Sequence, residues 1–128
     1  MSLTLMAVAA FNLNCVGEQT ILSVRPPARI AEPYSRTYRV DLDRMEWCAG
    51  DCSETLDIST ANQRGIIFFD TPKGGADRRT DMVNRETGSH FAVFSGEGYA
   101  VAWRGVCTAV PFTALPPKRE HEPVKQRF

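Results

Sequence analysis

The stretch Arg36–Asp43, which reads RTYRVDLD, decides the fold because apolar and charged side chains alternate along it. The apolar set on one face of the extended chain is Tyr38, Val40 and Leu42. The charged set on the opposite face is Arg39, Asp41 and Asp43. Such alternation is typical of a β-strand with one buried and one solvated face. We expect Met45–Cys48 to return as its hairpin partner after a turn at Asp43-Arg44.

The rest of the chain consists of short apolar or alternating runs separated by Gly, Pro and Asp. Further strands are expected over residues 11–16, 56–58, 65–70, 81–86, 89–94 and 99–104. Segment 65–70 is apolar on both faces, which favours a central strand covered on both sides or a strand at an interface. Three prolines assign residues 23–33 to a loop or an edge strand: Pro26, Pro27 and Pro33. The sequence therefore predicts an all-β fold, a single antiparallel meander of seven or eight strands that forms a small, disulfide-stapled barrel or sandwich.

Length and charge limit the functional classes. A chain of 128 residues and 14.2 kDa is enough for one domain. Its Lys and Arg residues balance its Asp and Glu residues, and a net charge of zero argues against nucleic-acid binding, which needs a basic surplus. No run of about 18 apolar residues occurs, so no membrane-spanning helix is expected.

The two ends differ from the central β-domain, which we place at residues 11–115. Residues 1–10 contain Ala7-Val8-Ala9, which has the form of a signal-peptide cleavage site, and we interpret them as a signal-peptide remnant. This favours a periplasmic or secreted protein; the alternative is that residues 5–16 simply form the first strand. Residues 116–128 begin with Pro116-Pro117, are rich in charge and are expected to be a disordered tail.

Four cysteines, an even number in a small domain, favour disulfides: Cys15, Cys48, Cys52 and Cys107. Cys48 and Cys52 flank a three-residue loop with a central glycine, which suits a tight reversal and a short bridge. Cys15 and Cys107 follow apolar residues at period two in the first and last strands, so both should point inward and pair. Chain entropy makes that long bridge worth about 4–5 kcal/mol, against about 2 kcal/mol for the short one. The alternatives are a zinc site completed by His90 or His121, and a redox pair.

Aromatic and basic segments supply the candidate binding residues. Tyr34, Tyr38 and Trp47 lie on neighbouring segments and could form a binding surface, with ordinary packing as the alternative. The loop Lys73–Arg79, KGGADRR, could hold an anion through Arg78 or Arg79, or be a hydrated tip.

No catalytic motif occurs in the chain, and we expect no catalytic residue, metal or cofactor. His90 lies in an expected strand and could act as a general base, but a single histidine in a β-domain is more often structural. Asp41 and Asp43 share the polar face of their strand and are interpreted as solvated charge.

The stretch from Glu32 to Cys52, EPYSRTYRVDLDRMEWCAGDC, resembles small exported proteins of alphaproteobacteria whose function is unknown. FNLNCVG at residues 11–17, VNRETG at residues 83–88 and the late Cys107 with Pro111-Phe112 are similar too. The resemblance covers most of residues 11–115. It implies an exported β-domain and brings no activity, substrate or catalytic residue with it.

A shorter stretch, Ser95-Gly96-Glu97-Gly98-Tyr99, is similar to the start of the S-G-x-x-Y motif of periplasmic lysozyme inhibitors, which are small disulfide-containing β-barrels. In that family the serine and a downstream lysine enter the lysozyme active site. Here Trp103-Arg104-Gly105 stands where the lysine element would be, with a shorter spacing and arginine in place of lysine. The resemblance implies that Ser95 and Arg104 would be the inhibitory residues.

These observations lead to one expectation about function and two alternatives. We expect a non-catalytic exported or envelope β-domain that binds a protein partner or a small ligand. The first alternative is a secreted inhibitor of a lysozyme-type enzyme, which requires Ser95 and Arg104 to protrude together from one exposed loop. The second is an enzyme, which requires a pocket with a titratable group beside a nucleophile. An edge strand or segment 66–69 could also pair across a homodimer.

Overall fold

The fold is an all-β structure in the computed structural model, which describes residues 9–71 and 77–117. No helix occurs among these residues, and none of their segments is a helix able to cross a membrane. The nine strands are β1 (Ala10–Val24), β2 (Pro27–Asp41), β3 (Glu46–Ala49), β4 (Leu56–Asp57), β5 (Thr60–Ala61), β6 (Gly65–Asp70), β7 (Arg78–Asn84), β8 (Ser89–Gly96) and β9 (Tyr99–Val110).

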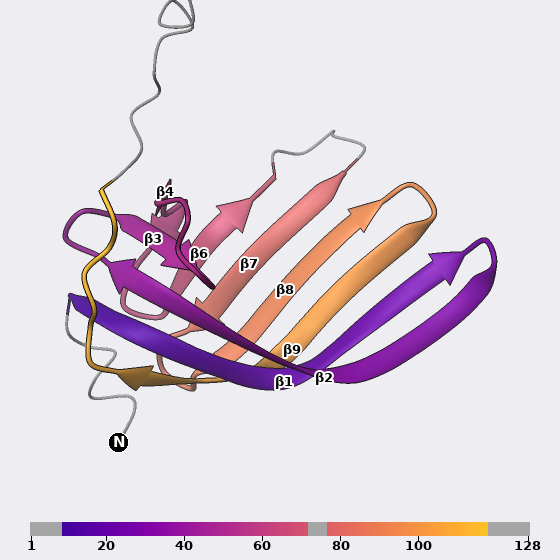
Figure 1. The fold of residues 1–128 in the computed structure, drawn as a ribbon, viewed down its shortest axis with the longest axis horizontal. Coiled ribbons are helices and arrows are strands. Elements are labelled where there is room, and N and C mark those ends of the chain that lie inside the picture. The colour runs from indigo at the N-terminus through magenta and orange to yellow at the C-terminus, as the bar shows by residue number, and fades with distance from the viewer. Residues whose placement is uncertain (1–8, 72–76, 118–128) are drawn as a thin grey trace, which may run out of the picture.

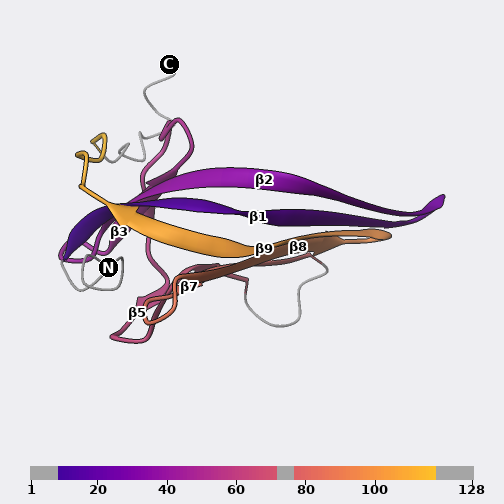
Figure 2. The same ribbon diagram turned by 90° about the horizontal axis from the view of Figure 1, so that it is seen from below.

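All nine strands form one antiparallel sheet in the order β4-β3-β2-β1-β9-β8-β7-β6-β5. The first and last strands are neighbours inside the sheet, because β1 pairs with β2 on one side and with β9 on the other. The sheet curls into a half-barrel whose two long hairpins, β1–β2 and β8–β9, extend to the same end of the molecule (Figures 1 and 2). The tips touch there, since Val24 N–H donates to the Gly98 carbonyl at 2.9 Å.

The opposite end of the half-barrel is closed by the chain itself. The two edge strands, β4 and β5, follow each other in sequence and are joined by Ile58 and Ser59. Ile58 N–H donates to the Met45 carbonyl beside β3, while Ser59 N–H donates to the Ile67 carbonyl in β6. Two consecutive residues therefore link the two edges, and Ile58 itself is buried against the core.

The hydrophobic core fills this closed end. Its largest fully buried side chains come from the inward positions of β1, β2, β6 and β7: Phe11, Leu13, Tyr38, Val40, Ile66, Phe68 and Val83. Tyr38 and Phe68 stack with ring centroids 4.6 Å apart, and Trp47 lies 4.9 Å from Phe68. The alternation seen in RTYRVDLD is thus confirmed, since Tyr38 and Val40 are buried and Arg39 and Asp41 are not.

Both expected disulfides are confirmed, Cys15–Cys107 and Cys48–Cys52. Cys15 and Cys107 are direct partners in the β1–β9 register and are both 1 % exposed. Gly50, in the loop between the other pair, has a φ of 64°, the left-handed conformation for which glycine is suited. The described residues contain no free cysteine.

Two expectations about the strands need correction. The described sheet has nine strands rather than seven or eight, because Thr60–Ala61 forms a two-residue strand that carries no sequence alternation. Segment 65–70 is not central: it lies between β7 and the short edge strand β5, and Phe69 is 36 % exposed. Of the two structures expected for the proline-rich segment, the edge strand is the one observed: residues 27–36 form the outer half of β2, whose side away from β1 has no strand partner among the described residues.

The prolines of β2 are compatible with that free edge. The Thr37 carbonyl accepts a hydrogen bond from Gly50 on the side of β3, so odd-numbered residues of β2 direct their backbone groups away from β1. Pro27 and Pro33 occupy odd positions, where a missing N–H costs no bond to β1. Residues 1–8 of the expected signal-peptide remnant, residues 73–76 of the KGGADRR loop and residues 118–128 of the expected tail lie outside the described residues.

Candidate functional site

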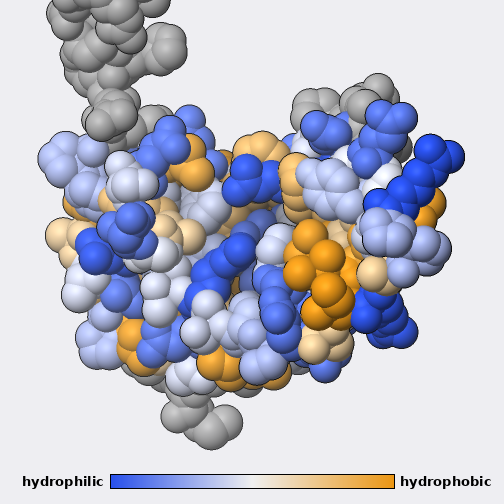
Figure 3. All heavy atoms as spheres, turned by 45° about the vertical axis from the view of Figure 1, so that its right-hand side comes forward, coloured by the Kyte–Doolittle hydropathy of each residue, from blue (hydrophilic) through white to orange (hydrophobic). Residues whose placement is uncertain are grey.

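The concave side of the half-barrel contains two adjoining hollows that share Arg36, Arg79 and Asp81. The larger one, of about 490 Å³, extends between β2, β3 and β7 and is also lined by Ser35, Thr37, Trp47, Ala49 and Gly50. The smaller one, of about 240 Å³, continues over β8 and β9 and is also lined by Thr80, Ala92, Val93, Phe94 and Trp103. Figure 3, which turns the hairpin-tip side forward, shows a largely hydrophilic hollow with an apolar patch beside it.

Strand register explains why these side chains meet. Arg36 lies opposite the buried Cys15, and Asp81 lies opposite the buried Ala92, so both arginine and aspartate project from inward positions of their strands. In the sheet β2 and β7 are separated by three strands, yet both line the same hollow. The curl of the sheet therefore brings Arg36 and Arg79 together from opposite wings.

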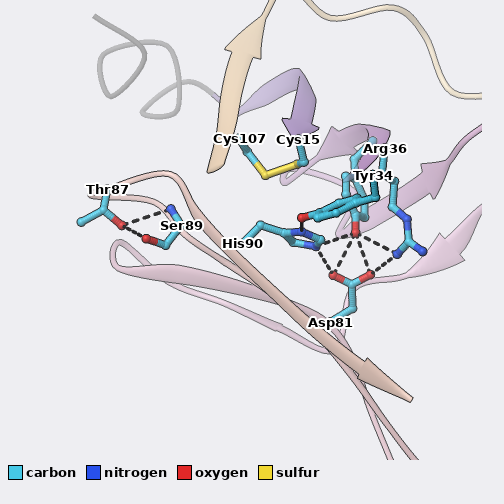
Figure 4. The surroundings of a disulfide bond; sticks show 9 residues. Cys15, Tyr34, Arg36, Asp81, Thr87, Ser89, His90 and Cys107 are labelled. Carbon is cyan, nitrogen blue, oxygen red and sulfur yellow. Dashed lines mark hydrogen bonds and ion pairs between the residues drawn. A yellow bond between two sulfur atoms is a disulfide. The ribbon is translucent and has the colours of Figure 1, made fainter. Parts of the chain in front are cut away.

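A buried hydrogen-bonded cluster forms the floor of this site: Tyr34, Arg36, Tyr38, Asp81 and His90 (Figure 4). The Tyr38 hydroxyl donates to Asp81 Oδ2 at 2.7 Å and also lies 2.9 Å from His90 Nε2. His90 Nε2 is 3.0 Å from Asp81 Oδ1, and His90 Nδ1 is 2.6 Å from Tyr34 Oη. Arg36 Nη1 donates to Asp81 Oδ2 at 3.2 Å.

One proton arrangement satisfies every member of this cluster. Ionised Asp81 accepts bonds from Arg36, from the Tyr38 hydroxyl and from a protonated Nε2 of His90. The remaining nitrogen, Nδ1, then accepts the hydroxyl proton of Tyr34. Asp81 is thereby almost fully buried with its charge compensated, which is the condition under which a buried carboxylate is tolerated.

Two glycines make the Tyr34 contact geometrically accessible. Tyr34 is on β2 and His90 on β8, so the tyrosine side chain must cross β1 and β9. Gly17 and Gly105 face each other on those two strands, and a Cβ on Gly105 would lie 2.7 Å from the Tyr34 hydroxyl and overlap the Val16 carbonyl. Any larger residue at Gly105 would displace Tyr34.

Burial raises the pKa of both tyrosines of the cluster. For Tyr38 the pKa is raised far above its usual value, mainly by burial and further by the charge of Asp81. For Tyr34 the pKa is also raised, mainly by burial, against an opposing effect of Arg36. Burial lowers the pKa of Arg36, but its interactions with Tyr38 and Asp81 outweigh this and raise it, so the guanidinium stays charged.

These directions predict alkaline destabilisation. A tyrosine whose pKa is higher in the folded state contributes stability that is present below its unfolded pKa of about 10 and is lost as the pH rises above it. Tyr38 alone should lower the free energy of unfolding by up to about 1.4 kcal/mol per pH unit above pH ~10, and Tyr34 should add a smaller slope. Urea denaturation between pH 8 and pH 11 measures this slope.

The Tyr38→Phe variant should show a shallower alkaline decline, although its stability at neutral pH is lower. Tyr99→Phe is the matched control, because Tyr99 is 43 % exposed and belongs to no cluster with Asp81. An equal slope in all three proteins would contradict the assigned role of Tyr38.

The Tyr34–His90–Asp81 chain has the connectivity of a nucleophile, a base and an orienting acid. Neither Tyr34 nor His90 is among the residues that line the two hollows, and burial raises the pKa of Tyr34, which disfavours its ionised form. The cluster is better described as a support that holds Arg36 in place beneath the hollow.

Arg36 and Arg79 keep donors for a ligand. Both hydrogen bonds that the Arg36 side chain donates to described residues leave from Nη1, whereas a guanidinium has five N–H groups. Its carbon Cζ lies 5.0 Å above the Trp103 ring, and Trp103 Nε1 in turn donates to Gln19 at 2.6 Å. Arg79 is exposed, stacks on Phe69 at 4.8 Å and forms no ion pair among the described residues.

The structure brings the three expected aromatic residues together but buries them, and it places Ser95 and Arg104 elsewhere. Tyr38 and Trp47 are 0 % and 3 % exposed, with ring centroids 5.7 Å apart in the core, and Trp47 also lines the larger hollow. Tyr34 is half-buried in the cluster. Ser95 and Arg104 lie within β8 and β9 and do not share a loop: Ser95 pairs with Ala100, and Arg104 pairs with Phe91. Both face away from the hollow, and Ser95 is half-buried. The joint protrusion required for inhibition is therefore not present.

Metal binding finds little support in the described cysteines and histidine. Ligand atoms of Cys15, Cys107 and His90 lie within 4.8 Å of one another, but the two sulfur atoms are bonded to each other and offer no thiolate. His90 uses both ring nitrogens in the cluster. His121, the other histidine of the zinc alternative, lies outside the described residues.

Sequence reasoning singled out Arg79 but missed Arg36, Asp81 and Trp103. A signal existed for Asp81, since strand periodicity places it on the same face as the apolar Val83 two residues later. Arg36 stands two residues before Tyr38 and so shares its inward face. Nothing in the sequence shows that these residues meet.

Comparisons of the chain with protein-family models, with curated proteins and with solved structures find no match. The feature that bears most directly on function is the concave site itself. The guanidinium groups of Arg36 and Arg79 line the two hollows together with Asp81, whose carboxylate is fully hydrogen-bonded, and with aromatic side chains.

Proposed function

We propose that this protein is a non-catalytic binding module, exported or associated with the cell envelope, that holds a small organic anion in its concave hollow. The observation that carries the proposal is that Arg36 and Arg79, from opposite wings of the sheet, line the same two hollows. Guanidinium groups recognise carboxylates through paired, charge-assisted hydrogen bonds. Buried disulfides are compatible with an oxidising, extracytoplasmic compartment.

The charge balance of the site favours an anion. Asp81 is the only carboxylate among the described residues that line the two hollows, and its oxygens are already occupied by Arg36, Tyr38 and His90. Arg79 therefore contributes an uncompensated positive charge. Arg36 is held by the cluster below and by Trp103 at the side, so little side-chain entropy remains to be lost when a ligand binds.

Calorimetric titration with benzoate and with the neutral benzamide tests this function. Benzoate should bind, benzamide should bind at least about tenfold more weakly, and added salt should lower the affinity for benzoate. Arg79→Gln should weaken benzoate about tenfold or more, because a charged hydrogen bond contributes about 1.5–3 kcal/mol. Arg79 is exposed and the fold should survive its replacement.

Arg78→Gln is the matched control. Arg78 is the exposed neighbour on the same strand, pairs with Ser95 and lines neither hollow. It should leave benzoate affinity unchanged. Equal loss in both variants, or equal binding of benzoate and benzamide, would refute the anion site.

A further inference from the structure

One transverse row of the concave face joins Arg79 to four apolar side chains. Arg79 lies opposite Phe94 on β8, Phe94 lies opposite Val101 on β9, and Val101 lies opposite Ile21 on β1. Ile21 in turn lies opposite Ile30 on β2. Directly opposed residues point to the same face of a sheet, and Phe94 lines the smaller hollow together with Arg79. The row therefore carries a cation at one end and continuous apolar surface beyond it.

This apolar surface remains open. Ile30 is 51 % exposed, and Ile21, Phe94 and Val101 are only half-buried. The neighbouring row toward the closed end is polar or aromatic, since it contains Glu32, Gln19 and Trp103. An apolar strip bounded in this way is typical of a ligand-binding surface rather than of scattered surface hydrophobes.

We propose that the ligand of this site is an amphipathic anion, with its acidic head group between Arg36 and Arg79 and an unbranched alkyl chain along the row from Phe94 to Ile30. This inference rests on the proposed function and names its ligand class. Strands in a sheet are about 4.8 Å apart, so the four steps from β7 to β2 span roughly 19 Å, enough for a medium or long chain.

The shape and charge of the row favour this occupant over a second copy of the chain. The row lies on the concave side of a curled sheet, where a flat β-sheet of a partner cannot stack across its whole width. The positive charge is confined to the Arg79 end, which matches a ligand with one polar end.

The test is a calorimetric series of acetate, butanoate, hexanoate and octanoate against the intact protein. A methylene that is fully buried contributes about 0.8 kcal/mol, so affinity should rise about two- to fourfold per methylene on this half-open surface. Octanol, which has the same chain without the charge, should bind at least about tenfold more weakly than octanoate. Octyl phosphate distinguishes the two kinds of acidic head group. Binding of either octanoate or octyl phosphate supports the proposal, and the anion that binds more tightly shows whether the natural head group is a carboxylate or a phosphate.

Two variants locate the chain. Ile30→Ser should reduce the gain per methylene for the longer members of the series while leaving acetate unchanged. Val16→Ser is the matched control: Val16 is 58 % exposed on the convex face of β1, pairs with Val106 and should change nothing. Because both side chains are more than half exposed, both variants should fold.

The possible failures are distinguishable. If benzoate binds but octanoate binds no better than acetate, the apolar row is wrong and the anion site stands. If Ile30→Ser and Val16→Ser have the same effect, the chain does not follow the row. If neither octyl phosphate nor a carboxylate of any length binds, both the ligand class and the proposed function fail. The last outcome concerns a dimer. If the protein is a dimer that stays intact with octanoate but dissociates in the Ile30→Ser variant, a second copy covers the row and the inference is overturned.

Discussion

Replacing both Cys15 and Cys107 by alanine is expected to lower the free energy of unfolding by about 4–5 kcal/mol. The two cysteines are 92 residues apart, so their bridge restricts nearly the whole unfolded chain, and the entropy of loop closure grows with loop length. A loss of this size is comparable to much of the total stability of a small domain. Urea denaturation of the oxidised protein and of the double variant measures the difference.

The Cys48→Ala/Cys52→Ala variant is the matched control. It removes the same atoms from buried positions, but its two cysteines are separated by only four positions in the sequence, so the expected loss is about 2 kcal/mol. The long-bridge variant should also show a steeper dependence on urea, because its unfolded state is more expanded. Equal losses in the two double variants would contradict the chain-entropy explanation.

Replacing Asp81 by alanine should lower the free energy of unfolding by about 3 kcal/mol or more. Asp81 accepts bonds from Tyr38, His90 and Arg36, and both Tyr38 and His90 are at most 3 % exposed. Without the carboxylate these buried donors have no replacement from water, and each unsatisfied group costs about 1–3 kcal/mol. The same variant should weaken benzoate binding, because Arg36 loses its fixed position.

Chemical denaturation of Asp81→Ala, with Asp43→Ala as control, tests this role. Asp43 is exposed beside the β2–β3 turn, and its replacement should change stability by less than about 0.5 kcal/mol. Asp81→Asn retains one acceptor oxygen, so its loss of unfolding free energy should lie between those of Asp81→Ala and Asp43→Ala. A loss for Asp81→Ala as small as that for Asp43→Ala would mean that the cluster does not support the site.

The strands were predictable wherever side chains alternate. Period-two patterns, together with turns such as the one at Gly88, whose φ is 83°, were enough to predict three parts of the sheet. These are the strand at Arg36–Asp41, the hairpin of 81–86 and 89–94, and the start of β9. The proline-rich outer half of β2 was predicted as a loop or an edge strand, and it forms an edge, because proline removes a donor and only a free edge makes that loss harmless. The two-residue β5 has no pattern to read.

The candidate site was far less predictable. Arg79 was identified as a possible anion ligand from its basic loop, and His90 as a titratable group in a strand. Tyr38 and Trp47 look the same in sequence as residues of a binding surface, and only their complete burial assigns them to the core. The contact of Tyr34 with His90 depends on two facing glycines in other strands, which no local pattern indicates.

Local patterns were enough to predict which side chains face inward and which cysteines pair, because strand periodicity and short turns are local properties of the chain. That β2 and β7 face each other across a hollow depends instead on the folded sheet as a whole. That arrangement arises from the curl of the whole sheet, from the irregular register between Ile67 and Phe69 and from the Ile58-Ser59 link between its edges. Each is set by twist and packing summed over many strands, so Arg36 and Arg79 become neighbours through contacts that no single segment encodes.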